Sequence, residues 1–135
     1  KNAINPALHD LSYETPFMVD SNDITEPMRK KILGAITSSK ENWIIITHGT
    51  DTMSVTAEFL KEQLPPTHGR TIILTGSMTP LREFTLSDGS FNLGYAISAL
   101  EHLDPGIYMA MHAQVFPAGD VLKDRATARF EFKDL

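Results

Sequence analysis

The chain has 135 residues, a length that suits one globular domain with its own core and is too short for two. Hydrophobic residues make up 41% of it and charged residues 21%, which is ordinary for a globular protein. The net charge of −5 argues against a nucleic-acid partner, and the lack of cysteine excludes disulfides and thiol nucleophiles. No apolar run approaches the roughly 18 residues that cross a bilayer, and no signal peptide is visible, so we expect no membrane partner and a cytoplasmic location.

Strand-like and helix-like patterns alternate along the chain, which predicts a parallel sheet covered by helices on both faces. The first helix is expected to begin near Thr25, an N-cap residue type, and to end in the polar run 37–40. Later helices are expected over 53–64, where Pro65 and Pro66 stop the helix, and over 90–103. The predicted strands cover 16–19, 43–47, 71–75 and 107–111, and the tail 112–135 has a turn at 117–120.

Polar clusters follow three of the predicted strands, and ligands of such sheets bind beyond the carboxyl ends of the strands. Ser21-Asn22-Asp23 follows the first strand, His48-Gly49-Thr50-Asp51-Thr52 the second, and Gly76-Ser77-Met78-Thr79-Pro80 the third. Gly49 lets the backbone approach a ligand. The sequence therefore predicts that these loops share one site.

Each cluster also has a purely structural interpretation. Thr50 and Asp51 are residue types that cap helices, although capping does not explain the whole pentapeptide. Lys123 is either a proton carrier or a solvated tail lysine beside Asp124. The segment 21–23 binds an amino acid or simply forms a turn that caps the next helix.

The loop at Ser77 places backbone groups over the same site or is a plain connection between strand and helix. Ser77 has no base nearby in the sequence, so it is a poor candidate for a serine nucleophile. No His-x-His or HExxH spacing occurs, and the glycine spacing fits neither a P-loop nor a dinucleotide fingerprint. We therefore expect no metal and no organic cofactor.

Three segments together resemble the bacterial-type asparaginase/glutaminase family. Residues 45–53, Ile-Ile-Thr-His-Gly-Thr-Asp-Thr-Met, are similar to its second signature, and this motif is highly specific. Residues 73–80 and 87–93 resemble the next conserved block, and Lys123 falls where the family keeps its catalytic lysine. The resemblance covers about residues 17–130 and implies a flavodoxin-like three-layer α/β/α fold.

The resemblance also implies roles for particular residues. Thr50, Asp51 and Lys123 would form the family's second catalytic triplet. Ser21 would hold the α-carboxylate of the substrate, and Asp51 with Asn22 its ammonium group, although the family usually has Gln in place of Asn22. The backbone carbonyl of Ser77 would receive the NH₂ of the scissile amide. We expect Lys123 Nζ to lie within about 4 Å of Thr50 or Asp51 side-chain oxygens.

Two parts of the family pattern are absent from this sequence: the first strand with its Thr-Gly-Gly-Thr motif and the C-terminal domain. Because the chain begins at Lys1 and not at Met, we expect residues upstream of it. The absent strand would lie between 16–19 and 43–47, so we expect either a gap there or another segment that fills it.

The leading functional hypothesis is hydrolysis of the side-chain amide of L-asparagine, or of a related small amide, to the acid and ammonia. The expected partner is thus a small amino-acid amide, and the resemblance implies a homo-oligomer. One alternative is an amidotransferase subunit that delivers ammonia to a tRNA-bound substrate. The other is a non-catalytic module that binds an amino acid, because the resemblance implies that the absent Thr-Gly-Gly-Thr motif supplies the family's primary nucleophilic threonine.

Overall fold

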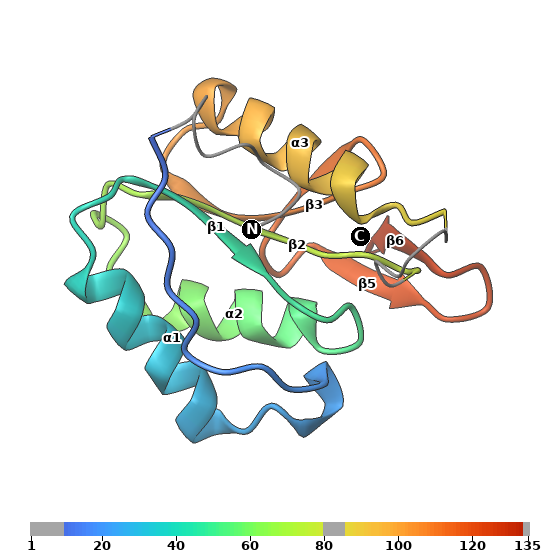
Figure 1. The fold of residues 1–135 in the computed structure, drawn as a ribbon, viewed down its shortest axis with the longest axis horizontal. Coiled ribbons are helices and arrows are strands. Elements are labelled where there is room, and N and C mark those ends of the chain that lie inside the picture. Colours follow the sequence, from blue (N-terminus) through green and yellow to red (C-terminus); the bar gives the residue numbers. More distant parts are fainter. Residues whose placement is uncertain (1–9, 80–85, 134–135) are drawn as a thin grey trace.

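The computed structural model describes residues 10–79 and 86–133, and its helices and strands alternate over most of this range (Figure 1). The elements, in chain order, are η1 (Ser21–Asp23), α1 (Glu26–Ser38), β1 (Trp43–Thr47), α2 (Met53–Gln63), β2 (Thr71–Thr75), α3 (Gly89–Ala99), η2 (Leu100–His102), β3 (Gly106–Met111), β4 (Gln114–Pro117), β5 (Val121–Asp124) and β6 (Arg129–Phe132).

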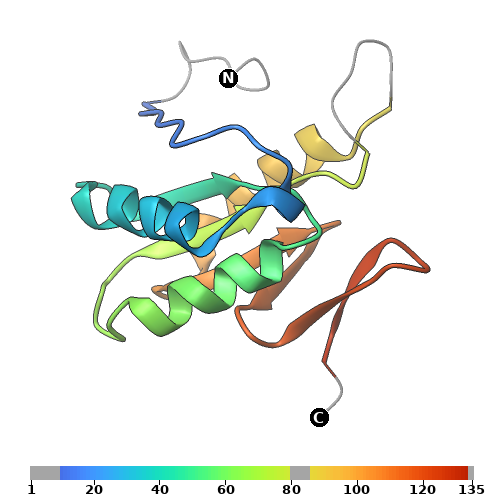
Figure 2. The same ribbon diagram turned by 90° about the horizontal axis from the view of Figure 1, so that it is seen from below.

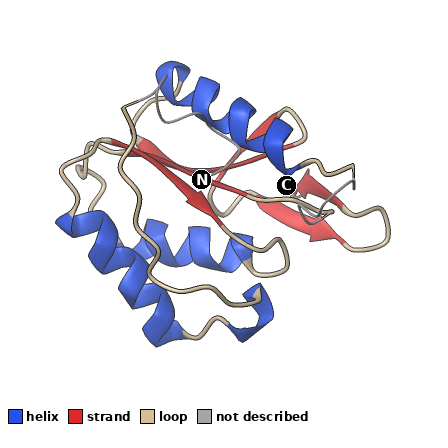
Figure 3. Cartoon of the chain, in the orientation of Figure 1, coloured by secondary structure: helices blue, strands red, loops and turns tan. Residues whose placement is uncertain are grey.

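A sheet of order β1-β2-β3-β4 forms the middle of three layers. β1, β2 and β3 run parallel, whereas β4 is antiparallel to β3. Helices α1 and α2 cover one face of the sheet and α3 covers the other (Figure 3). The predicted α/β/α arrangement is therefore confirmed, and three of the four predicted strands are present.

The two cores follow from the alternation of side chains along β2. Ile72 and Leu74 pack into the cluster that α1 and α2 cover, while Ile73 faces the cluster on the α3 side. All five residues of β2 are buried because the strand has neighbours on both edges and helices on both faces. The carboxyl end of β2 is thereby fixed, and the loop that follows it starts from a rigid position.

The predicted strand at 16–19 is wrong, because residues 17–20 adopt no regular structure. Pro16 has no N–H to donate to a ladder. Phe17 packs against the larger core cluster, while Met18 is 88% exposed, so the apolar residues here do not build a strand.

β1 is an edge strand within the described part of the chain, since it pairs with β2 alone. Trp43 is 57% exposed, and the three isoleucines that follow it are half-buried, so the expectation that this strand is buried on both faces is only partly met. Residues 16–19 form no ladder with β1. The prediction that this edge carries either a gap or another segment stays a prediction.

The tail forms two hairpins that the sequence pattern did not reveal. His112 and Ala113 connect β3 to β4 with positive φ angles of 50° and 59°, as in a type I′ turn. β5 and β6 form a separate two-stranded sheet that projects beyond the main sheet (Figure 2). No described helix is long and apolar enough to span a membrane.

The β5–β6 hairpin is attached to α2 by buried side chains and by polar contacts. Val121 and Phe130 belong to the larger core cluster. Lys61 Nζ donates to the Ala118 carbonyl oxygen at 2.9 Å, and Lys133 pairs with Glu58 at 2.9 Å. These contacts determine where β5 presents its side chains.

Candidate active site

Thr50 and Asp51 lie in the loop between β1 and α2. The N-cap of α2 is Thr52, and it makes no side-chain capping hydrogen bond. Its hydroxyl instead donates to the Ser21 carbonyl oxygen at 2.7 Å. The capping interpretation of Thr50 and Asp51 is therefore wrong, because neither residue is the N-cap of α2.

Lys123 reaches both residues from β5. Its Nζ donates to Thr50 Oγ1 at 2.9 Å and to Asp51 Oδ1 at 2.5 Å. The predicted proximity across 72 residues is confirmed. The Lys123 side chain is only 16% exposed, so it is not a solvated tail lysine.

Asp51 is the acidic member of this cluster, and its side chain is 35% exposed. The hydrogen bond from Lys123 lowers the pKa of the Asp51 carboxyl most, followed by the bond from Asn22 and by the positive charge of Lys123. The carboxylate is thus ionised at neutral pH and holds the lysine against Thr50.

The segment at η1 joins the same cluster. Asn22 Nδ2 donates to Asp51 Oδ2 at 2.9 Å and to Asp20 Oδ1 at 3.1 Å. Ser21 is buried against Gly49, where a Cβ would lie 2.7 Å from Ser21 Cβ and 2.8 Å from its Oγ. Gly49 is therefore required for the close approach of these two segments, and the ligand approach expected for it stays a prediction.

His48 anchors the start of the loop and has partners that sequence reasoning missed. Its Nδ1 lies 2.7 Å from the Gly49 carbonyl oxygen, which only accepts, so Nδ1 carries the proton. Nε2 then accepts from the Thr56 hydroxyl at 2.8 Å, and Arg29 Nε donates to Thr56 Oγ1 at 3.0 Å. Burial is the main cause that lowers the pKa of His48, and Arg29 lowers it further.

The loop after β2 lies beside the loop after β1. His48 N donates to the Thr75 carbonyl oxygen at 2.9 Å, and a Cβ on Gly76 would overlap the His48 carbonyl oxygen. Ser77 follows directly and is half-buried. The structure therefore brings all seven predicted site residues to one edge of the sheet, at the carboxyl ends of β1 and β2.

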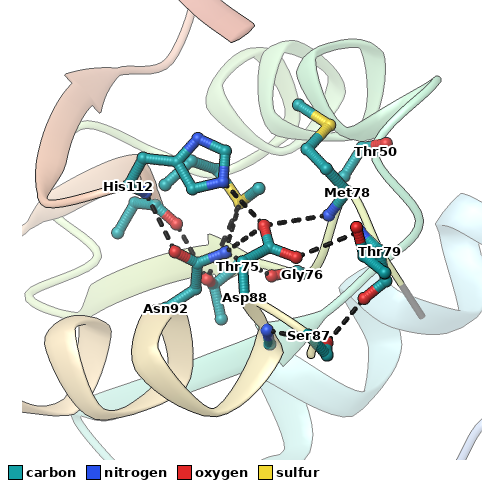
Figure 4. A network of polar contacts seen from close by, with 12 residues as sticks. Thr50, Thr75, Gly76, Met78, Thr79, Ser87, Asp88, Asn92 and His112 are labelled. Atoms are coloured by element: carbon teal, nitrogen blue, oxygen red, sulfur yellow. Dashed lines mark hydrogen bonds and ion pairs between the residues drawn. The ribbon is translucent and has the colours of Figure 1, made fainter. Parts of the chain in front are cut away.

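Three further residues hold this second loop, and none was assigned a role from the sequence. Asp88, Asn92 and His112 form a network of hydrogen bonds with residues 76–79 (Figure 4). The only signal for Asp88 and Asn92 was that residues 87–93 resemble a conserved block of the family, and His112 had no such signal. Among the described residues, no group of three or more His, Asp or Glu is arranged to hold a metal ion.

Comparison with known proteins identifies the family. The family model "Asparaginase, N-terminal" matches residues 3–135. The chain is 33% identical over 128 residues to a glutaminase-asparaginase of Acinetobacter glutaminasificans, covering 87% of this chain and 38% of that protein. It is 33% identical over 115 residues to a probable periplasmic L-asparaginase of Haemophilus influenzae, covering 82% and 32%.

Solved structures agree with this assignment. L-asparaginase I from Vibrio cholerae matches with a TM-score of 0.85 and 26% identity, covering 98% of this chain and 43% of that one. A probable cytoplasmic L-asparaginase from Campylobacter jejuni matches with a TM-score of 0.74 at 26% identity, covering 87% and 37%. The chain thus spans less than half the length of these relatives. It belongs to the asparaginase family and has the flavodoxin-like fold of that family's N-terminal domain.

Proposed function

We propose that this protein hydrolyses the side-chain amide of L-asparagine, or of a related small amide, to the acid and ammonia. The observation that carries the proposal is the double contact of Lys123 Nζ with Thr50 Oγ1 and Asp51 Oδ1. Membership of the asparaginase family supports the same chemistry.

The chemistry needs a base, because a threonine hydroxyl is a weak nucleophile until a neighbouring group takes its proton. Lys123 is the group in contact with the Thr50 hydroxyl, and Asp51 holds it there. We therefore assign Thr50 as the hydroxyl that exchanges a proton with Lys123. In the uncharged form the lysine accepts this proton as Thr50 Oγ1 bonds to the amide carbon. As the ammonium form it gives the proton to the amide nitrogen, which leaves as ammonia when the C–N bond breaks. Water then hydrolyses the resulting ester to release the acid and restore the threonine.

The substrate contacts follow from the atoms that remain available. Asn22 uses its amide N–H groups on Asp20 and Asp51, so its Oδ1 is left to accept from a substrate ammonium. The Asp51 carboxylate supplies the opposite charge for the same ammonium. We assign Ser21 to the α-carboxylate, the Gly49 backbone to the wall of the site, and the Ser77 carbonyl to the scissile amide.

The second candidate is a non-catalytic module that binds an amino acid. It applies if no Thr-Gly-Gly-Thr segment, which the printed sequence does not contain, belongs to the protein. A cytoplasmic location and a homo-oligomeric state stay predictions, and the names of the relatives include both a cytoplasmic and a periplasmic protein.

Two measurements on the purified chain separate the candidates. Ammonia release is followed with L-asparagine and with L-glutamine, and the backbone amides are followed by NMR during titration with L-aspartate. Release of ammonia with shifts at Ser21, Asp51 and Ser77 supports the hydrolase. Shifts at these residues without any ammonia release move the binding module to first place. No release and no shifts at this edge of the sheet would overturn both.

A further inference from the structure

The loop Gly76–Thr79 is held by side chains from another element, α3 and the turn before it. Asp88 Oδ2 accepts from Met78 N at 3.0 Å, and Asp88 Oδ1 accepts from Thr79 N at 3.0 Å. Asn92 Nδ2 donates to the Gly76 carbonyl oxygen at 2.9 Å. The backbone is therefore fixed on both sides of Ser77, while the Ser77 side chain takes no part.

These contacts determine the direction of the Ser77 carbonyl. The Ser77 carbonyl and the Met78 N–H belong to one peptide unit, and in a trans unit the two groups point in opposite directions. Because the Met78 N–H points at the Asp88 carboxylate, the Ser77 oxygen points away from it. A hydrogen bond to the N–H of a peptide unit also polarises its carbonyl and makes that oxygen a better acceptor.

The oxygen oriented in this way has no hydrogen-bond partner within the described part of the chain. Its loop contacts the loop of Thr50, because His48 N donates to the Thr75 carbonyl oxygen and Gly76 packs against the His48 carbonyl oxygen.

Two more residues fix the Asp88 carboxylate itself. His112 Nε2 lies 2.6 Å from Asp88 Oδ2, and Asn92 Nδ2 donates to the same oxygen at 3.0 Å. Asn92 is fully buried, and its Oδ1 accepts from His112 N at 2.9 Å, which ties the β3–β4 turn to α3. Burial raises the pKa of Asp88, but the bonds from Met78, Thr79 and His112 outweigh it and bring the pKa to about 2.

We propose that Asp88 is a positioning residue that orients the Ser77 carbonyl toward the NH₂ group of the scissile amide, with Asn92 and His112 holding the Asp88 carboxylate in place. This proposal rests on the amidohydrolase function proposed above. It assigns Asp88 no contact with substrate and no proton transfer.

Two ligands test the positioning role of Asp88. L-asparagine carries an NH₂ group that can donate to the Ser77 carbonyl, whereas L-aspartate has no such group. Affinity for each is measured by calorimetry in a Thr50→Ala background, which lacks the hydroxyl and so keeps asparagine intact. Asp88→Asn places an NH₂ group against backbone donors, so the peptide unit of Ser77 loses its alignment. We expect asparagine affinity to fall about threefold to tenfold, the worth of one hydrogen bond, and aspartate affinity to stay within about twofold.

Asp104→Asn, a matched acid-to-amide change at an exposed position, is the control and should alter neither affinity. Equal loss for both ligands in Asp88→Asn, or no loss for either, would overturn the positioning role while leaving the amidohydrolase intact. A Thr50→Ala protein that binds neither ligand would overturn both proposals.

A second pair of variants covers the case in which Asp88→Asn does not fold. His112→Leu removes the donor to Asp88, whereas His112→Gln keeps an N–H at similar reach. We expect a smaller loss, confined to asparagine, in His112→Leu and recovery in His112→Gln. Equal effects of the two variants on both ligands would contradict the role of His112.

Discussion

The loop after β1 (the first loop) and the loop after β2 (the second loop) leave neighbouring parallel strands at the same edge of the sheet, yet they use their residues in opposite ways. After β1, the side chains of Thr50 and Asp51 point toward Lys123 and carry the proposed chemistry. After β2, the side chain of Ser77 has no assigned role, and the backbone of Gly76–Thr79 is held by Asp88 and Asn92.

The two aspartates show what this difference means electrostatically. Asp51 is stabilised mainly by the side chain of Lys123, and part of its carboxylate remains exposed, so a ligand ammonium can approach it. Asp88 is stabilised by backbone N–H groups and by His112. A carboxylate held by the backbone has little freedom to move, which suits it to positioning but not to proton transfer.

The largest expected effect comes from removing Lys123, the β5 side chain that contacts the first loop. Lys123→Met keeps the length of the side chain but has no nitrogen to take the proton from Thr50. Because proton transfer is a transition-state role, we expect kcat for asparagine to fall by about 10²–10⁴-fold with a much smaller change in KM. Steady-state ammonia release measures both constants.

The control for Lys123→Met is Lys30→Met, since Lys30 makes only an exposed ion pair with Glu26 on α1. We expect kcat for this variant to stay within about twofold of the wild type. Equal losses in the two variants would mean that Lys123 acts only through stability.

The next largest effect, on the free energy of unfolding, is expected when the glycines of the two loops are replaced by alanine. Gly76→Ala directs a Cβ at the His48 carbonyl oxygen, which is backbone and has no rotamer to change. Gly49→Ala meets Ser21, where the side-chain Oγ can rotate even though Cβ cannot. We expect Gly76→Ala to lower the free energy of unfolding by about 3 kcal/mol and Gly49→Ala by about 1–2 kcal/mol.

Urea denaturation measures these values, with Gly34→Ala as the control. A Cβ on Gly34 meets nothing within 4 Å and the residue lies inside α1, so alanine there should stabilise by about 0.5–1 kcal/mol. A Gly49→Ala protein that loses more stability than Gly76→Ala would show that the first loop is the more rigid of the two.

A smaller loss is expected from removing the buried amide that ties the second loop to α3. Asn92→Leu leaves the Gly76 carbonyl and the His112 N–H without their partner in the protein. We expect the free energy of unfolding to fall by about 2 kcal/mol, the cost of unsatisfied buried polar groups. Asn42→Leu, at an exposed position, should change it by less than about 0.5 kcal/mol, and a similar loss in both variants would contradict the importance of the network.

Most elements of the fold could be predicted from the sequence, and the exceptions have physical reasons. Three of the four predicted strands and all three predicted helices are present, because buried strands such as Thr71–Thr75 and amphipathic helices have strong periodic patterns. The predicted strand at 16–19 is wrong because Phe17 packs half-buried against the core cluster without belonging to a ladder. The β3–β4 hairpin was missed because its turn uses His112 and Ala113 at positive φ, where asparagine or glycine is the usual signal.

For the site, the first loop could be predicted and the second only in part. Thr50 and Asp51 were found because their motif is specific, and Lys123 was found from its place in the family pattern, although only the fold brings Lys123 to them across 72 residues. Asp88 and Asn92 act on backbone atoms through contacts between distant segments. No local pattern distinguishes such residues from ordinary residues at the start of a helix, so their role could be recognised only once the backbone was placed.

The smallest of the four effects is the pH dependence of stability that His48 contributes to the first loop. Burial, aided by Arg29, holds the pKa of His48 below its ordinary value of 6.5, so the folded protein binds this proton less readily than the unfolded chain. This contribution to stability is therefore complete above about pH 6.5 and is lost as the pH falls toward the lowered value. Burial lowers the pKa of His68 as well, so His68 contributes in the same direction, whereas the lowered carboxyl pKa values of Asp51, Asp88 and Asp124 act only near pH 4 and below.

We expect urea midpoints to fall between pH 7.5 and pH 5.5 in the wild type and to fall less in His48→Asn, which keeps a donor for the Gly49 carbonyl but does not titrate. His102→Asn, at an exposed position, should retain the full wild-type dependence, and a His48→Asn protein that does so too would show that His48 is not the titrating group.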